Sequence, residues 1–169
     1  MNDLNITSNS SAGVLELVLE GSLNEAAKFD SIDMSSINEI FIDFNAVTFI
    51  NSTGINKWVA WMNELESSYR EAQISFCNCP KIIVDQLNAV KGFLPLNARV
   101  ESFWLPFYCE DSDRREFMLM TREKEFKEES TEGPEWVNIP ECNCSQSNTP
   151  CDPDIMPTKY FAFMKKRTA

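Results

Sequence analysis

The chain contains 169 residues, 43% of them hydrophobic, which is enough for one compact core with room for a small second module. Acidic residues outnumber basic ones by 26 to 15, and a formal net charge of −11 repels phosphate backbones and anionic membranes, so we expect no nucleic-acid partner. Histidine is absent, which excludes Ser-His-Asp and Cys-His catalysis and leaves an enzyme only carboxylates, thiols, lysines or a cofactor.

The N-terminal sequence lacks the features of a targeting segment. Its first residues, MNDLNITSNSSAG, contain neither the basic nor the apolar region of a signal peptide. No apolar run reaches the roughly 18 residues of a membrane-spanning helix. We therefore expect a cytoplasmic protein with no membrane span. In that compartment its six cysteines are expected to be reduced thiols or metal ligands rather than disulfides.

Residues 1–97 alternate between strand-like and helix-like segments. Apolar runs bounded by turn residues predict strands at 14–19, 40–44 and 74–77. Helix formers, apolar residues at helical spacing, and the placement of proline and glycine predict helices at 24–29, 54–69 and 80–92. This order predicts an α/β domain, in which helices pack on one face of a small mixed β-sheet.

The remaining residues, 98–169, predict a β-rich, ribbon-like module that ends in a helix. A charged stretch with helix-breaking residues at 122–135 is expected to be an exposed loop or hairpin tip. Aromatic side chains are dense in this part of the chain, and we expect them to attach the module to the first domain. They are Phe103, Trp104, Phe107, Tyr108, Trp136, Tyr160, Phe161 and Phe163.

The most informative segment is a polar turn between the predicted strand 40–44 and the helix that begins at Gly54. A short apolar loop leads from the strand to Asn51, Ser52 and Thr53. Asn51 or Ser52 can cap the helix, whose free N–H groups and dipole also favour an anion. A phosphate on Ser52 is therefore tolerable, yet its charge of about −1.5 to −2 would repel an acidic partner. The same residues also suit a plain helix cap.

The segment at 47–54, with the sequence VTFINSTG, resembles the STAS domain of anti-sigma-factor antagonists. In that family a strand, a loop that reads V-T-F-I-D-S-S/T-G and a long helix follow one another at this spacing, and the resemblance extends over residues 10–96. It implies that Ser52, with Thr53 beside it, is phosphorylated by an ATP-dependent anti-sigma kinase and that dephosphorylation restores binding. Asn51 replaces the family's aspartate, which keeps the cap but removes a charge from the kinase site.

The resemblance implies a non-enzymatic signalling protein that binds a protein partner, an anti-sigma or serine kinase, through this turn. The implied partner-binding residues are Asn51, Ser52, Thr53, Gly54 and Trp61. Trp61 lies off the apolar stripe of its helix, so we expect it either to be exposed beside the partner surface or to pack against the C-terminal module. The alternative function, which the same fold also serves, is a phosphorylation-independent scaffold or assembly adaptor.

Four cysteines in the C-terminal part, Cys109, Cys142, Cys144 and Cys151, can supply thiolates to a structural zinc ion. The segment around Cys109 resembles the first knuckle of a zinc ribbon, in which Ser112 stands where a second cysteine is usual. Cys142 and Cys144 resemble the second knuckle, with one spacer residue instead of two. Either the ribbon has rebuilt its ligand set with Cys151, or it has lost its metal.

A second Cys-Asn-Cys sequence ends the predicted strand at 74–77. Two residues apart on a strand, Cys77 and Cys79 would point to the same face. There they suit metal or redox chemistry, or packing as small buried hydrophobes. An enzyme that uses these thiols is a third functional hypothesis, for which no histidine or basic residue is placed to lower a thiol pKa.

Overall fold

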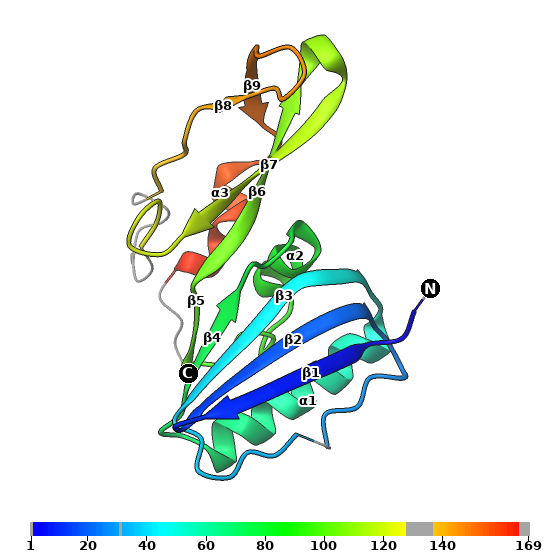
Figure 1. Ribbon diagram of the computed structural model, residues 1–169, viewed down its shortest axis with the longest axis vertical. Helices are drawn as coiled ribbons and strands as arrows, with labels where there is room; N and C mark the ends of the chain where they lie inside the picture. Colours follow the sequence, from blue (N-terminus) through cyan, green and yellow to red (C-terminus); the bar gives the residue numbers. More distant parts are fainter. Residues whose placement is uncertain (1, 31, 128–136, 166–169) are drawn as a thin grey trace.

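The computed structural model describes residues 2–30, 32–127 and 137–165 and folds them into two β-sheets, one beyond the other along the long axis of the molecule (Figure 1). The first sheet has five strands in the order β1-β2-β3-β4-β5. These are β1 (Asn5–Ser11), β2 (Val14–Leu23), β3 (Glu39–Ile50), β4 (Gln73–Cys77) and β5 (Ala98–Val100). β1 runs antiparallel to β2 and the other neighbours are parallel, so the sheet is mixed, as predicted.

Two helices, α1 (Ser52–Ser68) and α2 (Lys81–Ala89), lie on the same side of this sheet (Figure 1). The alternation of burial along β2 follows from this arrangement. Leu17 and Leu19 are buried, whereas Val18 between them is 46% exposed on the opposite face. The first sheet and its helices therefore confirm the α/β class, with one open sheet face.

The centre of the first core is Trp58 of α1, whose side chain is fully buried. Its ring centroid lies 5.3 Å from that of Phe44, 5.7 Å from that of Phe76 and 5.5 Å from that of Phe93. The indole N–H donates a hydrogen bond of 2.9 Å to the carbonyl oxygen of Phe93, so the polar atom of the ring is paired. Trp58 thus joins α1 to the sheet and to the loop that follows α2.

Two sequence predictions for this domain are wrong. Residues 24–29, predicted as a helix, form a turn followed by an extended segment, because the side-chain oxygen of Asn24 accepts a hydrogen bond from the backbone N–H of Ala26 at 2.9 Å and competes with helical bonding. The apolar loop expected before the polar turn belongs instead to β3, which pairs with β2 as far as Ile50 opposite Leu23.

The second sheet has four strands in the order β7-β6-β9-β8, and its neighbouring strands are antiparallel. They are β6 (Ser102–Cys109), β7 (Arg114–Thr121), β8 (Cys142–Asn143) and β9 (Pro150–Pro153). The predicted terminal helix is a single turn, α3 (Pro157–Tyr160), followed by a 3₁₀ turn at Ala162–Met164. Across the described part of the chain, no helix is long and apolar enough to cross a membrane.

Buried aromatic rings attach the second sheet to the C-terminal segment. Phe103 of β6 lies between 5.1 and 6.1 Å from the centroids of Phe126, Tyr160, Phe161 and Phe163. Phe126 comes from the charged stretch predicted to be exposed, and its burial corrects that prediction at this position. The C-terminal segment is also bonded to α2, because Asn88 donates to the carbonyl oxygen of Tyr160 at 2.9 Å and accepts from the N–H of Phe163 at 2.6 Å.

The other members of the predicted aromatic set differ in their environments. Phe107 is buried, whereas Tyr108 on the opposite face of β6 is 37% exposed. Trp104 is half-buried and donates its indole N–H to a side chain of β3 at 3.0 Å. Trp136, with most of the charged stretch at 122–135, lies outside the described residues.

Candidate functional site

The turn between β3 and α1 brings two hydroxyl groups to the surface. Asn51 is the helix cap, since its side-chain oxygen accepts a hydrogen bond from the N–H of Gly54 at 2.8 Å. Ser52 is the first residue of α1, and both Ser52 and Thr53 are exposed. Because Asn51 performs the capping, the Ser52 hydroxyl is not needed for it and stays available at the positive end of the helix.

Gly54 allows the end of β2 to lie against the start of α1. A Cβ atom on Gly54 would come within 2.0 Å of the carbonyl oxygen of Leu23 and 2.4 Å of its carbonyl carbon. The same carbonyl oxygen accepts a hydrogen bond from the N–H of Asn51 at 3.2 Å. The glycine of the turn is therefore required by the close approach of two backbone segments.

Two charged residues that sequence reasoning did not select complete the turn. Asn51 donates its side-chain N–H to a carboxylate oxygen of Glu25 at 2.8 Å. Lys57 of α1 donates to the carbonyl oxygens of Glu25 and Ala27, the latter at 3.1 Å. The hydrogen bond from Asn51 is the main cause that lowers the pKa of Glu25. A carboxylate thus lies against Asn51, the residue before Ser52, although position 51 itself carries no charge.

Replacing Asn51 with aspartate is expected to destabilise the protein at neutral pH. The pKa of Glu25 in the folded protein is below its ordinary value of 4.5. The contact with Asn51 therefore stabilises the fold fully at pH values above 4.5, and this stabilisation is lost as the pH falls through the pKa of the folded state. In the Asn51→Asp variant the amide donor is gone and the carboxylates of residues 51 and 25 face each other. The loss of stability relative to the wild type is therefore largest above about pH 5 and becomes smaller in acid. Thermal unfolding at pH 7 and pH 3 measures both differences.

The matched control is the double variant Asn51→Asp with Glu25→Gln, which restores a donor and an acceptor across the contact. Its melting temperature at pH 7 is expected to recover toward that of the wild type. Equal stability of Asn51→Asp and the wild type at both pH values would show that the Asn51–Glu25 contact does not form.

Trp61 does not occupy either position expected from the sequence. It is 7% exposed, so the prediction of an exposed ring is wrong. Its ring stacks on that of Phe29 with centroids 4.5 Å apart and planes 6° from parallel, and it meets Trp58 edge-on at 5.3 Å. The chain after β2 folds back over α1, where Lys57 bonds to it, and this contact buries Trp61 against Phe29.

The second candidate site is a cysteine cluster at the far end of the second sheet. Strand register brings it together: β6 pairs with β9 so that Cys109 and Cys151 are neighbours, with Cα atoms 4.4 Å apart, and β8 pairs with β9 so that Cys142 is opposite Cys151. Opposed residues of an antiparallel pair project from the same face. Three of the four cysteines predicted to bind zinc, Cys109, Cys142 and Cys151, therefore lie on one face of these strands.

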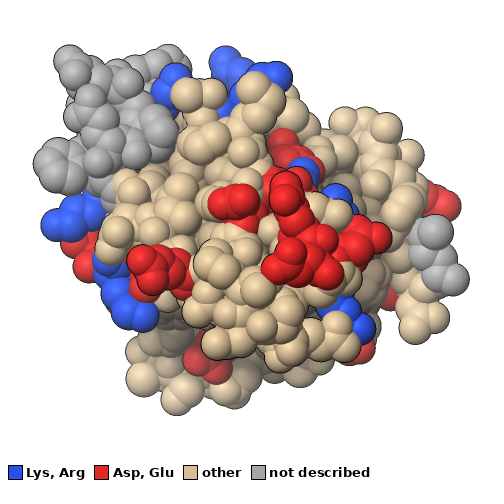
Figure 2. Space-filling model, turned by 90° about the horizontal axis from the view of Figure 1, so that it is seen from above, with Lys and Arg blue, Asp and Glu red and all other residues tan. Residues whose placement is uncertain are grey.

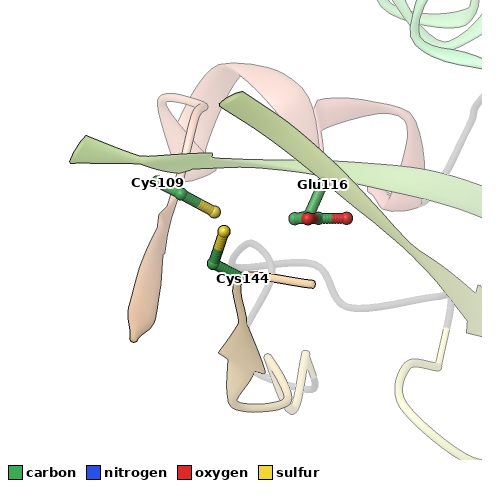
Figure 3. A group of neighbouring side chains, drawn as sticks. All are labelled: Cys109, Glu116 and Cys144. Carbon is green, nitrogen blue, oxygen red and sulfur yellow. The ribbon is translucent and has the colours of Figure 1, made fainter. Parts of the chain in front are cut away.

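Cys144 completes the cluster from the turn after β8. Its sulfur, that of Cys109 and a carboxylate oxygen of Glu116 all lie within 4.8 Å of one another, and Figure 3 shows the two sulfur atoms pointing toward each other. The Ser112 hydroxyl lies 3.1 Å from the Cys144 sulfur, so the position that differs from a ribbon knuckle still faces the cluster. Glu116 holds the turn by accepting hydrogen bonds from the N–H and hydroxyl of Ser145 at 2.9 and 2.6 Å.

The thiols of the cluster differ in acidity. Hydrogen bonds, first from the Ser112 hydroxyl and then from Ser147, lower the pKa of Cys144 to about 7. Burial raises the pKa of Cys142, with a further contribution from the charge of Glu116. Cys144 is therefore the cluster thiol that is most readily deprotonated near neutral pH.

Cys109 and Cys151 form a disulfide, which corrects the expectation that all six cysteines are reduced. The cause is the pairing of β6 with β9, which places the two residues at bridging distance. A disulfide sulfur carries no thiolate charge, so in this form Cys109 and Cys151 offer no thiolate to a metal. Cys109 and Cys151 could act as zinc ligands only after reduction of this disulfide.

The other cysteine pair, Cys77 and Cys79, lies where β4 ends. β4 ends at Cys77, and Asn78 has a left-handed backbone with φ of 52°, so the strand alternation expected to align the two thiols stops there. Cys79 is fully buried. Burial, followed by the charge of Asp43, raises the pKa of Cys77 to about 12, and such a thiol is protonated at neutral pH.

No protein-family model matches the sequence, and no curated protein matches it either. The chain is thus assigned to no family by these comparisons, and its class is that of an α/β protein with a mixed five-stranded sheet and an attached antiparallel sheet. Two features of the described residues bear on function, the polar turn between β3 and α1 and the cysteine cluster.

Proposed function

We propose that the chain is a non-enzymatic signalling protein of the anti-sigma-factor-antagonist type, in which a STAS-like domain binds a serine-kinase partner under phosphate control at Ser52. The observation that carries the proposal is the exposed Ser52 hydroxyl at the first position of α1, directly after β3. The resemblance of segment 47–54 to the STAS loop supports the same function. Asn51 and Thr53 flank the hydroxyl, and the buried Gly54 holds the turn against the end of β2.

The chemistry at Ser52 is a phosphoryl transfer that the partner catalyses. The Ser52 oxygen attacks the γ-phosphorus of ATP, the bond to ADP breaks, and the hydroxyl proton passes to a base of the kinase. The product adds about −1.5 to −2 charges one residue after the Asn51–Glu25 contact, so an acidic partner surface that tolerates the hydroxyl is repelled after the transfer. The N-terminus of α1 offsets part of this charge within the domain itself.

Labelling with ATP tests the proposal. The wild type, Ser52→Ala and Thr53→Ala are incubated with radioactive ATP and extract from cells that express the protein, and phosphate is mapped by mass spectrometry. We expect label in the wild type and in Thr53→Ala and its loss in Ser52→Ala. Label that survives in Ser52→Ala, or none in the wild type, would remove the phosphate control.

A phosphorylation-independent scaffold or assembly adaptor is the second candidate. The observation that favours it is Asn51, which stands where the STAS family has an aspartate. The Asn51 side chain donates a hydrogen bond to Glu25. In that case the turn offers only a binding surface. Binding of a partner with equal affinity to the wild type, Ser52→Ala and Ser52→Asp would support the scaffold over the switch.

The cysteine cluster has a separate, structural part in the proposed function. When reduced, Cys109, Cys142, Cys144 and Cys151 hold a zinc ion that stabilises the end of the second sheet. The register of β6, β9 and β8 supports this ligand set. The short strands there provide little core, and a structural zinc ion supplies folding energy to such modules.

A further inference from the structure

The same two sulfur atoms are required by two different structures of the cysteine cluster. In the disulfide, Cys109 and Cys151 are bonded to each other across β6 and β9. In a four-thiolate site both would have to be ionised and directed at the metal. Because a disulfide sulfur is not a thiolate, the protein can hold the disulfide or the complete zinc site, but not both at once.

We propose that the cluster is a redox-controlled zinc site, in which hydrogen peroxide converts Cys109 and Cys151 to the disulfide and so releases the ion. This inference rests on the zinc binding given under the proposed function. It adds the regulation of that site and the identity of the oxidised pair. Cys142 and Cys144 are free thiols beside this disulfide.

The oxidation proceeds in two balanced steps. The thiolate of Cys151 attacks one oxygen of hydrogen peroxide, the O–O bond breaks, and a sulfenic acid and hydroxide form. The thiolate of Cys109 then attacks the Cys151 sulfur, the S–O bond breaks, and a second hydroxide leaves as the disulfide forms. The two sulfurs lose two electrons, the peroxide gains them, and two protons convert the hydroxides to water.

Burial and charge both favour this oxidant over a bulky anionic one such as glutathione disulfide. Cys151 is 7% exposed and Cys109 is fully buried, so a small molecule reaches them more easily. Carboxylates are exposed around the same end of the sheet, at Glu110, Asp111, Asp113, Asp152 and Asp154. Figure 2 looks at the molecule from that end and shows acidic side chains gathered near its centre. Their field attracts a divalent cation and repels an anionic disulfide.

The observed disulfide identifies the pair that we expect oxidation to form. Cys109 and Cys151 lie on adjacent strands with Cα atoms 4.4 Å apart, a separation that a disulfide spans. Cys144 stays in a turn that Glu116 anchors through Ser145, so the turn does not depend on the metal alone. We therefore expect the oxidised form to keep its fold and the exchange to be reversible.

The test uses the full-length protein, reduced and loaded with zinc under nitrogen. Zinc per chain is measured by elemental analysis, its release after hydrogen peroxide is followed with the dye 4-(2-pyridylazo)resorcinol, and disulfides are located by non-reducing peptide mapping. We expect about one zinc ion per reduced chain, its loss on oxidation with a Cys109–Cys151 product, and rebinding after a phosphine reductant and zinc are added. Cys77→Ser, outside the cluster, is expected to behave as the wild type.

The outcomes separate the two proposals. Reduced wild-type protein that binds no zinc overturns the zinc site and the regulation with it. Zinc that binds but is not released by peroxide, or is released with a disulfide between other cysteines, overturns the regulation and leaves the zinc site standing. These readings come from the wild type, so a failure of Cys109→Ser or Cys151→Ser to fold does not affect them.

Discussion

Replacing Gly54 with alanine is expected to destabilise the protein by about 3 kcal/mol or more. The added Cβ would lie 2.0 Å from the carbonyl oxygen of Leu23 and 2.7 Å from the N of Asn24. Both are backbone atoms, so no rotation of a side chain relieves the overlap. Either β2 or the first turn of α1 has to move, and both are fixed by the core beneath them. Chemical denaturation followed by circular dichroism measures the loss.

The neighbouring substitution Thr53→Ala is the control for the Gly54 experiment. Thr53 is exposed on the same turn, so removing its hydroxyl and methyl groups is expected to change stability by less than about 0.5 kcal/mol. If Gly54→Ala cost as little as Thr53→Ala, the end of β2 would not lie against the start of α1. The placement of Ser52 at that junction would then be wrong as well.

Replacing Trp58 with alanine is expected to cost about 3–5 kcal/mol. The residue is fully buried, and its removal leaves a cavity among Phe44, Phe76 and Phe93. It also leaves the carbonyl oxygen of Phe93 without its indole donor. Trp58→Phe keeps a ring in the site and loses mainly the hydrogen bond, so a smaller loss of about 1–3 kcal/mol is expected.

Trp104→Ala provides the comparison for Trp58. Trp104 is half-buried on β6 and its indole donates to Asn45 in the first sheet. Less apolar surface is lost there, and solvent can reach the site, so the cost is expected to be smaller than at Trp58. Equal unfolding free energies for Trp58→Ala and Trp104→Ala would contradict a core centred on Trp58.

The strands and helices with strong apolar periodicity could be predicted from the sequence. The helix predicted at 54–69 is observed at Ser52–Ser68, and the strand predicted at 74–77 is observed at Gln73–Cys77. β1 could not be predicted, because Asn5–Ser11 is a polar, largely exposed edge strand with no alternation of apolar residues. Its place is set by pairing with β2, a long-range contact that leaves no local signal.

The candidate sites were predictable to different degrees. The polar turn at Asn51 and Ser52 follows from its position between a strand and a helix. No local sequence pattern indicates that Glu25 and Lys57 belong to this turn, because their contacts depend on the chain after β2 folding back over α1. The same fold-back buries Trp61, which the helical periodicity alone placed off the core stripe.

The four C-terminal cysteines could be grouped from their spacing alone, but their pairing could not. The disulfide depends on the register of β6 against β9, and a shift of one residue would separate Cys109 from Cys151. Glu116 lies at the cluster because the pairing of β7 with β6 places it opposite Phe107. Nothing in the local sequence around Glu116 indicates that position.

If the Ser52 hydroxyl controls binding of a kinase partner, substitutions at Ser52 change the affinity of that kinase for the protein. Isothermal titration calorimetry compares the wild type, Ser52→Ala, Ser52→Asp and Ser67→Asp, the last of which places the same charge at the exposed far end of α1. We expect Ser52→Asp to bind at least about tenfold more weakly, roughly 1.4 kcal/mol, while the other two variants stay within about threefold of the wild type. Equal affinity of all four proteins would contradict control at Ser52.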